Sequence, residues 1–370
     1  MQVEKLIEII DSDFYTGVPD SQLKALCDYL MKKYGISSNH IIGVNEGNCT
    51  ALAAGYYLST GKIPVVYMQN SGIGNMLNPT VSLLNEKVYG IPCIFIIGWR
   101  GEPETRDEPQ HVFQGEITIK LLEDLEIDTF IVTKDTKIDE IEKIMYEFRK
   151  QLKNGKSVAF VIRKGALIND DKIEYVNQYL MKREEIIEHI VSVAKKDLIV
   201  STTGKASREL FEIREKNNQS HKYDFLTVGS MGHSASIALG IAMHQPKKKV
   251  WCIDGDGSIL MHMGAMAVLG SSNINNLVHI VINNEAHETV GGMPTVASSV
   301  KLTEIAKGCG YTHVALVSNE QQLEYELNRA KKAKELYFIE VKAAIGARDD
   351  LGRPTKTAKE NKEMFMEYVI

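Results

Sequence analysis

The sequence predicts an α/β fold in which two domains each contain a doubly wound parallel sheet. Three observations lead to this prediction. Short apolar runs typical of buried strands alternate with segments of helical period along the chain. Residues 250–282 form one strand–helix–strand unit, an arrangement typical of parallel sheets. At 370 residues the chain is also long for a single core, so two domains are expected.

The first half contains the elements of one such domain. Strands are expected at 41–44, 65–68, 93–97, 130–133 and 158–162, and helices at 23–34, 50–58 and 138–152. A long polar loop is expected at 100–115. The stretch 163–177 is rich in Lys and Asp and is the expected linker, which places the two domains at 1–175 and 176–370.

The second half repeats this alternation. Strands are expected at 198–200, 225–228, 250–253, 277–282 and 337–341, and helices at 183–194, 259–269 and 320–334, before a charged tail. The two halves could be distant copies of one α/β plan, which periodicity alone does not decide.

Composition and motifs exclude several classes of function. The net charge of −5 argues against nucleic acid as the main partner. The five scattered cysteines show no zinc spacing, no apolar run is long enough to span a bilayer, and the N-terminus has no secretory signal, so a cytoplasmic protein is expected. The chain has neither a P-loop nor a complete dinucleotide fingerprint.

Two turns in the second half point to chemistry. The strand at 250–253 ends at Gly255-Asp256-Gly257-Ser258, and the strand at 277–282 ends at Asn283-Asn284. Turns at the carboxyl ends of adjacent parallel strands lie at the ligand-binding edge of the sheet. A carboxylate, an amide oxygen and diphosphate oxygens suit Mg²⁺, and glycines allow close approach of a phosphate. The alternative is that both are ordinary turns.

This pattern resembles that of the thiamine-diphosphate-dependent enzymes. The resemblance implies a pyrimidine-binding domain followed by a diphosphate-binding domain, with thiamine diphosphate and Mg²⁺ as cofactors. The implied metal ligands are Asp256, Asn284 and the backbone carbonyl of Ala286. The implied cofactor contacts are Thr203, Gly204, Gly229, Met231, Gly255, Gly257, Ser258 and Asn284. Met231 would wedge between the two cofactor rings, and Gly229 would accept a hydrogen bond from the amino group. Glu285 stands where related decarboxylases often have Gly.

Glu46 is the implied catalytic carboxylate of the first half. It follows a convincing buried strand and opens a helix. Without the resemblance, the simpler interpretation is a helix-start carboxylate satisfied by backbone donors. In this family, a Glu in such a setting hydrogen-bonds a ring nitrogen of the aminopyrimidine.

Three further segments resemble the phosphonopyruvate decarboxylase subfamily, which lacks the middle domain of larger thiamine decarboxylases. They are 14–21, 107–111 and 350–355, and the stretch 287–295 and residues 360–362 fit the same pattern. The resemblance implies decarboxylation of 3-phosphonopyruvate to phosphonoacetaldehyde and carbon dioxide, in phosphonate biosynthesis. The sequence departs from the subfamily at Met293 and Ala358.

The implied reaction needs a proton donor and cations for the phosphonate. Asp20 and His111 resemble proton-relay positions, although a turn Asp and a solvated loop His are the simpler alternatives. The expected phosphonate ligands are Arg353, Arg348 and Arg106, in that order.

The resemblance also implies a homo-oligomer with active sites between subunits, because in this family the pyrimidine and diphosphate ends are gripped by different subunits. Two alternatives remain open at this point. One is a sulfopyruvate decarboxylase, which would use the same cofactor, and the other is a non-catalytic cofactor-binding subunit.

Overall fold

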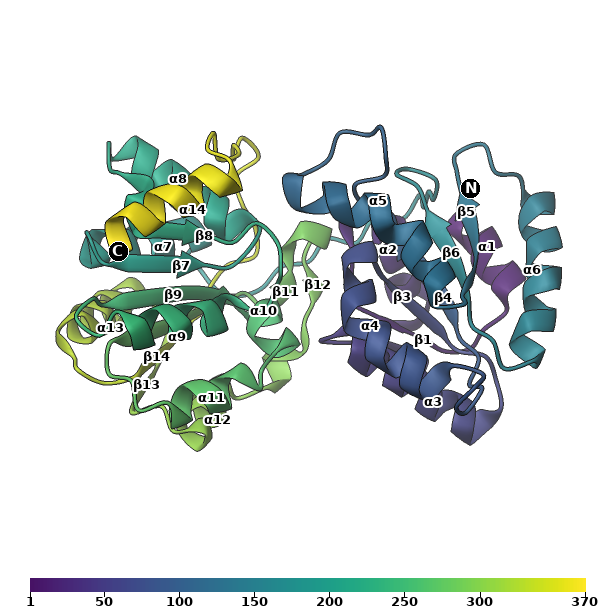
Figure 1. The fold of residues 1–370 in the computed structure, drawn as a ribbon, viewed down its shortest axis with the longest axis horizontal. Helices are drawn as coiled ribbons and strands as arrows, with labels where there is room; N and C mark the ends of the chain where they lie inside the picture. The colour runs from purple at the N-terminus through teal and green to yellow at the C-terminus, as the bar shows by residue number, and fades with distance from the viewer. The chain divides into compact units, whose positions relative to one another are not determined.

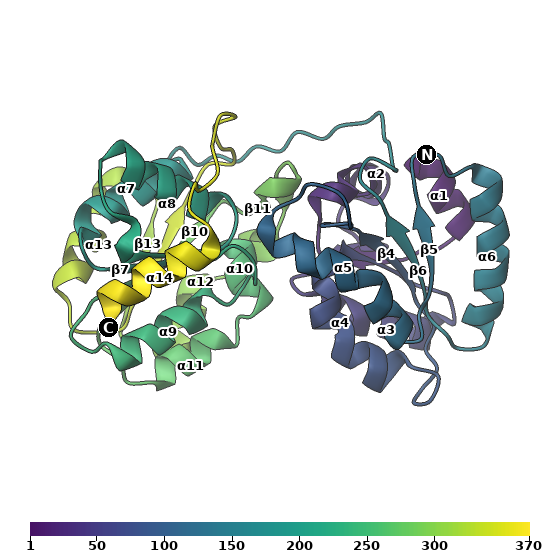
Figure 2. The same cartoon turned by 45° about the horizontal axis from the view of Figure 1, so that its top comes forward.

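The computed structural model describes residues 1–370 and divides into two units. Unit 1 comprises Met1–Glu174 together with Thr289–Met293, and unit 2 comprises Tyr175–Glu288 together with Pro294–Ile370. In each unit a central sheet is flanked by helices on both faces (Figures 1 and 2). No helix combines the length and apolar character needed to cross a membrane.

Unit 1 is built on a six-stranded parallel sheet. Its strands are β1 (Tyr15–Gly17), β2 (His40–Ile42), β3 (Val65–Gln69), β4 (Ile94–Gly98), β5 (Asp128–Val132) and β6 (Val158–Ile162). Its helices are α1 (Val3–Ile10), α2 (Lys24–Tyr34), α3 (Glu46–Thr60), α4 (Ile73–Pro79), α5 (Pro109–Asp124) and α6 (Ile138–Lys153). The strand order is β2-β1-β3-β4-β6-β5, and every pair is parallel.

Unit 2 is built on a second six-stranded parallel sheet. Its strands are β7 (Leu198–Ser201), β8 (Asp224–Leu226), β9 (Val250–Gly255), β10 (Leu277–Asn283), β13 (His313–Val317) and β14 (Tyr337–Lys342). Its helices are α7 (Arg183–Ala194), α8 (Lys205–Lys216), α9 (Ser234–His244), α10 (Asp256–Met261), α11 (Ala265–Ser271), α12 (Leu302–Cys309), α13 (Glu320–Lys332) and α14 (Ala358–Val369). Two very short strands, β11 (Ala286–His287) and β12 (Met293–Pro294), follow β10 in the chain.

The two sheets share one topology. Read from the same edge, the second sheet has the order β8-β7-β9-β10-β14-β13, which matches β2-β1-β3-β4-β6-β5 strand for strand. From β1 the chain continues to β2 on one side, whereas from β3 it continues to β4 on the other side, so the winding direction reverses between β1 and β3. The same reversal occurs between β7 and β9. Such switch points open a crevice at the carboxyl ends of the strands, where α/β proteins bind ligands. The predicted fold class is confirmed.

The side chains of unit 2 alternate between the two faces of its sheet. Trp251, Ile253 and Ile280 belong to an apolar core that also contains buried side chains of α7, α8 and α13. Cys252, Asp254 and His279, at the intervening positions of β9 and β10, point to the other face. Since β9 is buried on both faces, its carboxyl end is rigidly placed.

Several predicted elements differ from the structure. The helix expected at 259–269 is two helices, because the backbone leaves the helical region at His262 (φ −132°, ψ 48°) before α11 starts at Ala265. The loop expected at 100–115 ends earlier, since Pro109 starts α5. The charged tail contains the helix α14, whose N-terminus is stabilised by a capping box between Thr357 and Glu360.

Candidate active site

Asp256 is the first residue of α10, directly after β9. Its side chain is buried (4% exposed), and burial raises its pKa to about 6. Hydrogen bonds from the Thr295 hydroxyl (2.6 Å to Oδ2) and from the backbone of Gly257 partly offset this cost. No basic side chain pairs with Asp256, so the carboxylate lacks a counter-charge, and a bound cation would supply one.

The loop after β10 lies beside Asp256. Gly255 pairs with Ile282 in the β9–β10 register, so the two strands end together. Thr295 connects the two turns, because its hydroxyl donates to Asp256 and its backbone N–H donates to the Glu285 carbonyl (2.9 Å). Asn284 is buried, and its Oδ1 accepts from the N–H of Ala286 (3.1 Å). The edge therefore brings a carboxylate and an amide oxygen close together, and such hard oxygen ligands suit Mg²⁺.

Ser258 joins the ends of three strands of unit 2. Its hydroxyl oxygen accepts hydrogen bonds from the Thr202 hydroxyl after β7 and from the N–H of Gly232 after β8, both at 3.0 Å. Ser258 itself lies in the first turn of α10, after β9. The hydroxyls and backbone N–H groups of these turns therefore gather at the β7/β9 switch point, an arrangement suited to phosphate oxygens.

A hydrogen bond also connects the turn after β7 with the turn after β8. The Thr203 hydroxyl donates to the carbonyl of Val228 (2.8 Å), one residue before Gly229. Gly204 adopts φ +89°, a conformation that side chains rarely allow, immediately before α8.

Met231 and His287 pack against the glycine turn at the start of α10. A Cβ atom at Gly257 would lie 3.2 Å from the Met231 Cε and 3.5 Å from the His287 ring. Burial lowers the pKa of His287 to about 4, so the ring is neutral near neutral pH. The turn thus has an apolar wall beside its polar backbone.

Glu46 is the first residue of α3 in unit 1 and is also buried (4% exposed). The capping role at this helix belongs to Asn45, whose side chain accepts from the N–H of Gly47 (2.8 Å). The Glu46 carboxylate instead accepts from the Asn75 side chain (2.7 Å), and a Cβ at Gly72 would lie only 2.5 Å from it. Burial raises the pKa of Glu46, so this carboxyl is suited to holding a proton.

Asp20 lies at the β1/β3 switch point of unit 1. It is 2% exposed and accepts from the Gln69 side chain (2.7 Å) at the end of β3. A Cβ at Gly98, the last residue of β4, would lie 2.3 Å from its carboxylate. Burial raises the pKa of Asp20.

His111 lies in the first turn of α5, and sequence reasoning missed its charged neighbour Arg100. Burial and the positive charge of Arg100 lower the pKa of His111, and the same arginine acts on Asp20. Arg100 forms a forked ion pair with Asp107 (2.8 Å from Nε to Oδ2). The structure therefore brings Asp20, Arg100 and His111 together. The signal in the sequence was Arg100 at the start of the polar loop that contains the segment 107–111, which resembles the subfamily.

The three predicted phosphonate ligands have different surroundings. Arg348 pairs with three carboxylates, those of Glu184, Glu212 and Asp350. All three arginines, Arg106, Arg348 and Arg353, are exposed. Arg208 of α8 donates to the carbonyl of Gly352 (2.6 Å), so the segment before Arg353 is fastened to the helix that begins after Gly204.

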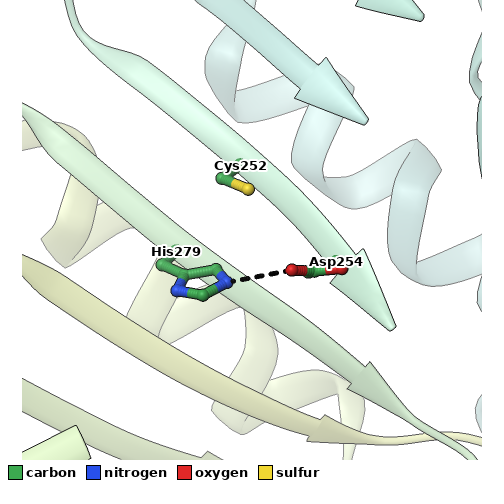
Figure 3. Close-up of side chains that lie close together, drawn as sticks. All are labelled: Cys252, Asp254 and His279. Carbon is green, nitrogen blue, oxygen red and sulfur yellow. Dashed lines mark ion pairs between the residues drawn. The ribbon is translucent and has the colours of Figure 1, made fainter. Parts of the chain in front are cut away.

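A buried polar cluster lies on β9 and β10, and its β9 members come just before the glycine turn in the chain (Figure 3). His279 Nε2 lies 3.5 Å from Asp254 Oδ2, and Cys252 completes the group within the sheet. His279 also bonds the Tyr311 hydroxyl (2.9 Å), and the second oxygen of Asp254 accepts from the N–H of Gly255 (2.9 Å). The cluster thereby fixes the residue just before Asp256.

Comparisons with known proteins place both halves of the chain in one family. Residues 3–124 match the family described as the thiamine pyrophosphate enzyme N-terminal TPP binding domain, and residues 202–341 match the C-terminal TPP binding domain. The chain is 32% identical to phosphonopyruvate decarboxylase of Streptomyces viridochromogenes, over 95% of this chain and 90% of that one. It is 27% identical to sulfopyruvate decarboxylase of Methanosarcina acetivorans, over 91% of this chain and 90% of that one. It is also 38% identical to the beta subunit of sulfopyruvate decarboxylase of Methanocaldococcus jannaschii, over 40% of this chain and 79% of that one.

Proposed function

The chain belongs to the thiamine pyrophosphate enzymes as a decarboxylase of the phosphonopyruvate and sulfopyruvate type, and we propose that its substrate is 3-phosphonopyruvate. The products would be phosphonoacetaldehyde and carbon dioxide, a step of phosphonate biosynthesis. The observation that supports this choice is the 32% identity to a phosphonopyruvate decarboxylase over 95% of the chain, against 27% for a full-length sulfopyruvate decarboxylase.

We further propose that unit 2 binds the diphosphate end of the cofactor through Mg²⁺. Asp256, Asn284 and the carbonyl of Ala286 would hold the metal, because they are hard oxygen ligands on two turns that Thr295 ties together. Ser258 and the glycine turns would donate to the phosphate oxygens. When bound, thiamine diphosphate supplies the electron sink that stabilises the charge left by departing carbon dioxide.

Unit 1 would bind the aminopyrimidine through Glu46. Its raised pKa suits a carboxyl that holds a proton at a ring nitrogen, and Asn75 orients it. In unit 2, Met231 would wedge between the two rings, and the carbonyl of Gly229 would accept from the amino group. Glu46 and Asp256 belong to different units of the chain. Because different subunits grip the two ends of the cofactor in this family, we propose a homo-oligomer with active sites between subunits.

Asp20 and His111 are the proposed proton donors for the carbon atom that loses carbon dioxide. Burial raises the pKa of Asp20 and favours its protonated form, while burial and then the nearby Arg100 lower the pKa of His111 and favour its neutral form, so one group can donate while the other accepts. Arg353 remains the first choice for the phosphonate. Arg348 is a weaker candidate, because its three carboxylate partners already neutralise its charge.

The test is aldehyde release from phosphonopyruvate, sulfopyruvate and pyruvate in parallel, each with and without thiamine diphosphate and Mg²⁺. Cofactor-dependent turnover of phosphonopyruvate well above the other two would support the proposal. A preference for sulfopyruvate would move the substrate and keep the site. An Arg353→Lys variant with an unchanged KM would remove that residue from the phosphonate site.

A further inference from the structure

We propose that Glu288 is a positioning residue that turns the amide oxygen of Asn284 toward the metal, and that Arg183 holds Glu288 in place. The inference rests on the metal site proposed above, and it concerns two residues outside that ligand set.

The Asn284 side chain has two different neighbours. Its Nδ2 donates to Glu288 Oε2 (2.8 Å), while its Oδ1 accepts from the N–H of Ala286 (3.1 Å). The Asn284 side chain is buried (7% exposed), and the Glu288 side chain is 8% exposed, so bulk water offers little competition for these bonds.

The chemistry of the two groups decides which way the amide points. An ionised carboxylate only accepts hydrogen bonds, whereas an amide has one donor end and one acceptor end. Glu288 can therefore bond only to the NH₂ end of Asn284. The oxygen end must face away from Glu288, toward the turn of Ala286, where the proposed metal needs an oxygen. An amide turned by 180° would bring its oxygen against a carboxylate and an NH₂ group against a cation.

Arg183 gives Glu288 a fixed place. Its guanidinium donates to Glu288 Oε2 (2.6 Å) and Oε1 (3.2 Å), and its other N–H groups donate to both oxygens of Glu209 (2.6 Å each). Lys205 adds a weaker contact to Glu288 Oε1 (3.3 Å). Arg183 thus bridges two buried carboxylates, of which only Glu288 contacts Asn284. Partners of this kind behind a metal ligand typically change metal affinity 10–100-fold when they are mutated.

The pair of carboxylates on Arg183 provides a matched control. Glu288→Gln and Glu209→Gln each remove one negative charge from the same arginine, but only Glu288→Gln replaces the acceptor-only group that faces the Asn284 amide with one that can also donate. We would measure binding of Mn²⁺ as a probe by electron paramagnetic resonance, with saturating thiamine diphosphate and no substrate. Thermal unfolding in EDTA would report how much each substitution destabilises the fold.

Glu288→Gln should weaken Mn²⁺ binding by at least about tenfold, and Glu209→Gln should change it by less than about threefold. Equal losses in the two variants, or an unchanged affinity in Glu288→Gln, would overturn the positioning role. If Glu288→Gln does not fold, Arg183→Lys takes its place in the test. This substitution keeps the positive charge but loses the forked hydrogen bonds to Glu288, so it should lower Mn²⁺ affinity by less than Glu288→Gln would. Failure of the wild-type protein to bind Mn²⁺ would refute the metal site itself, whereas normal Mn²⁺ binding without turnover would refute only the proposed substrate.

Discussion

Replacing Asp256 with Asn should stabilise the metal-free protein while abolishing its metal site. The carboxylate is buried against α10 without a basic partner, and its pKa is raised to about 6 by burial. A buried carboxylate without a bound cation destabilises the metal-free protein. The Asp256→Asn variant would have the same shape, would still accept one hydrogen bond from Thr295, and would carry no charge at this position.

The magnitude follows from the shift in pKa. A rise from 3.8 to about 6 corresponds to about 3 kcal/mol of unfolding free energy. Since the pKa of Asp256 is higher in the folded protein, the protonated carboxyl adds this stability in full below about pH 3.8, and the stability is lost as the pH rises through about 6. Asn does not titrate and avoids the loss, but it accepts one hydrogen bond fewer, at a cost of about 1 kcal/mol. The net gain at pH 8 is about 2 kcal/mol, and at pH 5 only about half of the 3 kcal/mol cost of ionisation remains.

Urea unfolding in EDTA at pH 8 and pH 5 measures this difference. The chain has two tryptophans, and Trp251 lies in β9, where its indole N–H donates to Asp197 (2.8 Å). A Trp99→Phe background therefore leaves a single fluorophore that reports unit 2. A parallel series with Mg²⁺ and thiamine diphosphate should stabilise only the protein that keeps Asp256.

The reasoning fails if Asp256→Asn is less stable than wild type in EDTA at pH 8. It also fails if the gain is the same at pH 5 as at pH 8, since a gain independent of pH cannot come from ionisation of the carboxyl. An equal response of both proteins to Mg²⁺ would show that Asp256 is not a metal ligand.

Three further predictions follow from the same geometry. Mg²⁺ affinity should fall about tenfold per pH unit below about 6, because the metal requires an ionised Asp256, and a flat calorimetric profile from pH 5 to 6 would contradict this. Glu46→Gln should lower kcat by about 10²–10⁴ while the affinity for thiamine diphosphate stays within about threefold, and wild-type rates would refute its role. Glu285 has φ +61° and pairs with Lys342 (3.0 Å) and Tyr179 (2.7 Å). Glu285→Gly loses these hydrogen bonds but relieves the backbone strain, so the unfolding free energy should change by less than about 1 kcal/mol. Glu285→Ala loses the bonds and keeps the strain, so it should destabilise the protein by about 2 kcal/mol, and equal stability of the two variants would show that the backbone carries no strain.

Local pattern was enough to predict most of the fold. The apolar runs of β3, β6 and β10 are buried on both faces, so their hydrophobicity is continuous and easy to recognise. The pattern missed short elements, and it also missed the longer helices α5, α8 and α9. β1 has three residues and ends at Gly17, and the break between α10 and α11 depends on the backbone at His262 rather than on hydrophobic period. The shared strand order of the two units could not be read from the sequence, because it is set by long-range pairing.

The candidate site divides in the same way. Glu46 opens α3 a short way after β2, and its role was inferred from the family resemblance. Asp256 and Asn284 directly follow the apolar strands β9 and β10, so their place at the edge of the sheet could be predicted from the sequence. Thr295 and Glu288 do not. Thr295 reaches Asp256 across 39 positions of the chain, and Arg183 reaches Glu288 across 105. Residues that orient a ligand through another side chain have no local pattern, and only the folded chain identifies them.

The two switch points explain how one topology can serve opposite ends of a cofactor. At the β7/β9 switch the groups are neutral donors, namely the hydroxyls of Thr202 and Ser258 and the backbone of glycine turns. At the β1/β3 switch the corresponding place is occupied by Asp20, a buried carboxyl held by Gln69. A diphosphate would be repelled there whenever Asp20 is ionised, whereas the crevice of unit 2 offers it neutral donors, beside the metal ligand that we propose in Asp256. The division of labour therefore follows from the side chains at the switch points and not from the fold, which is the same in both units.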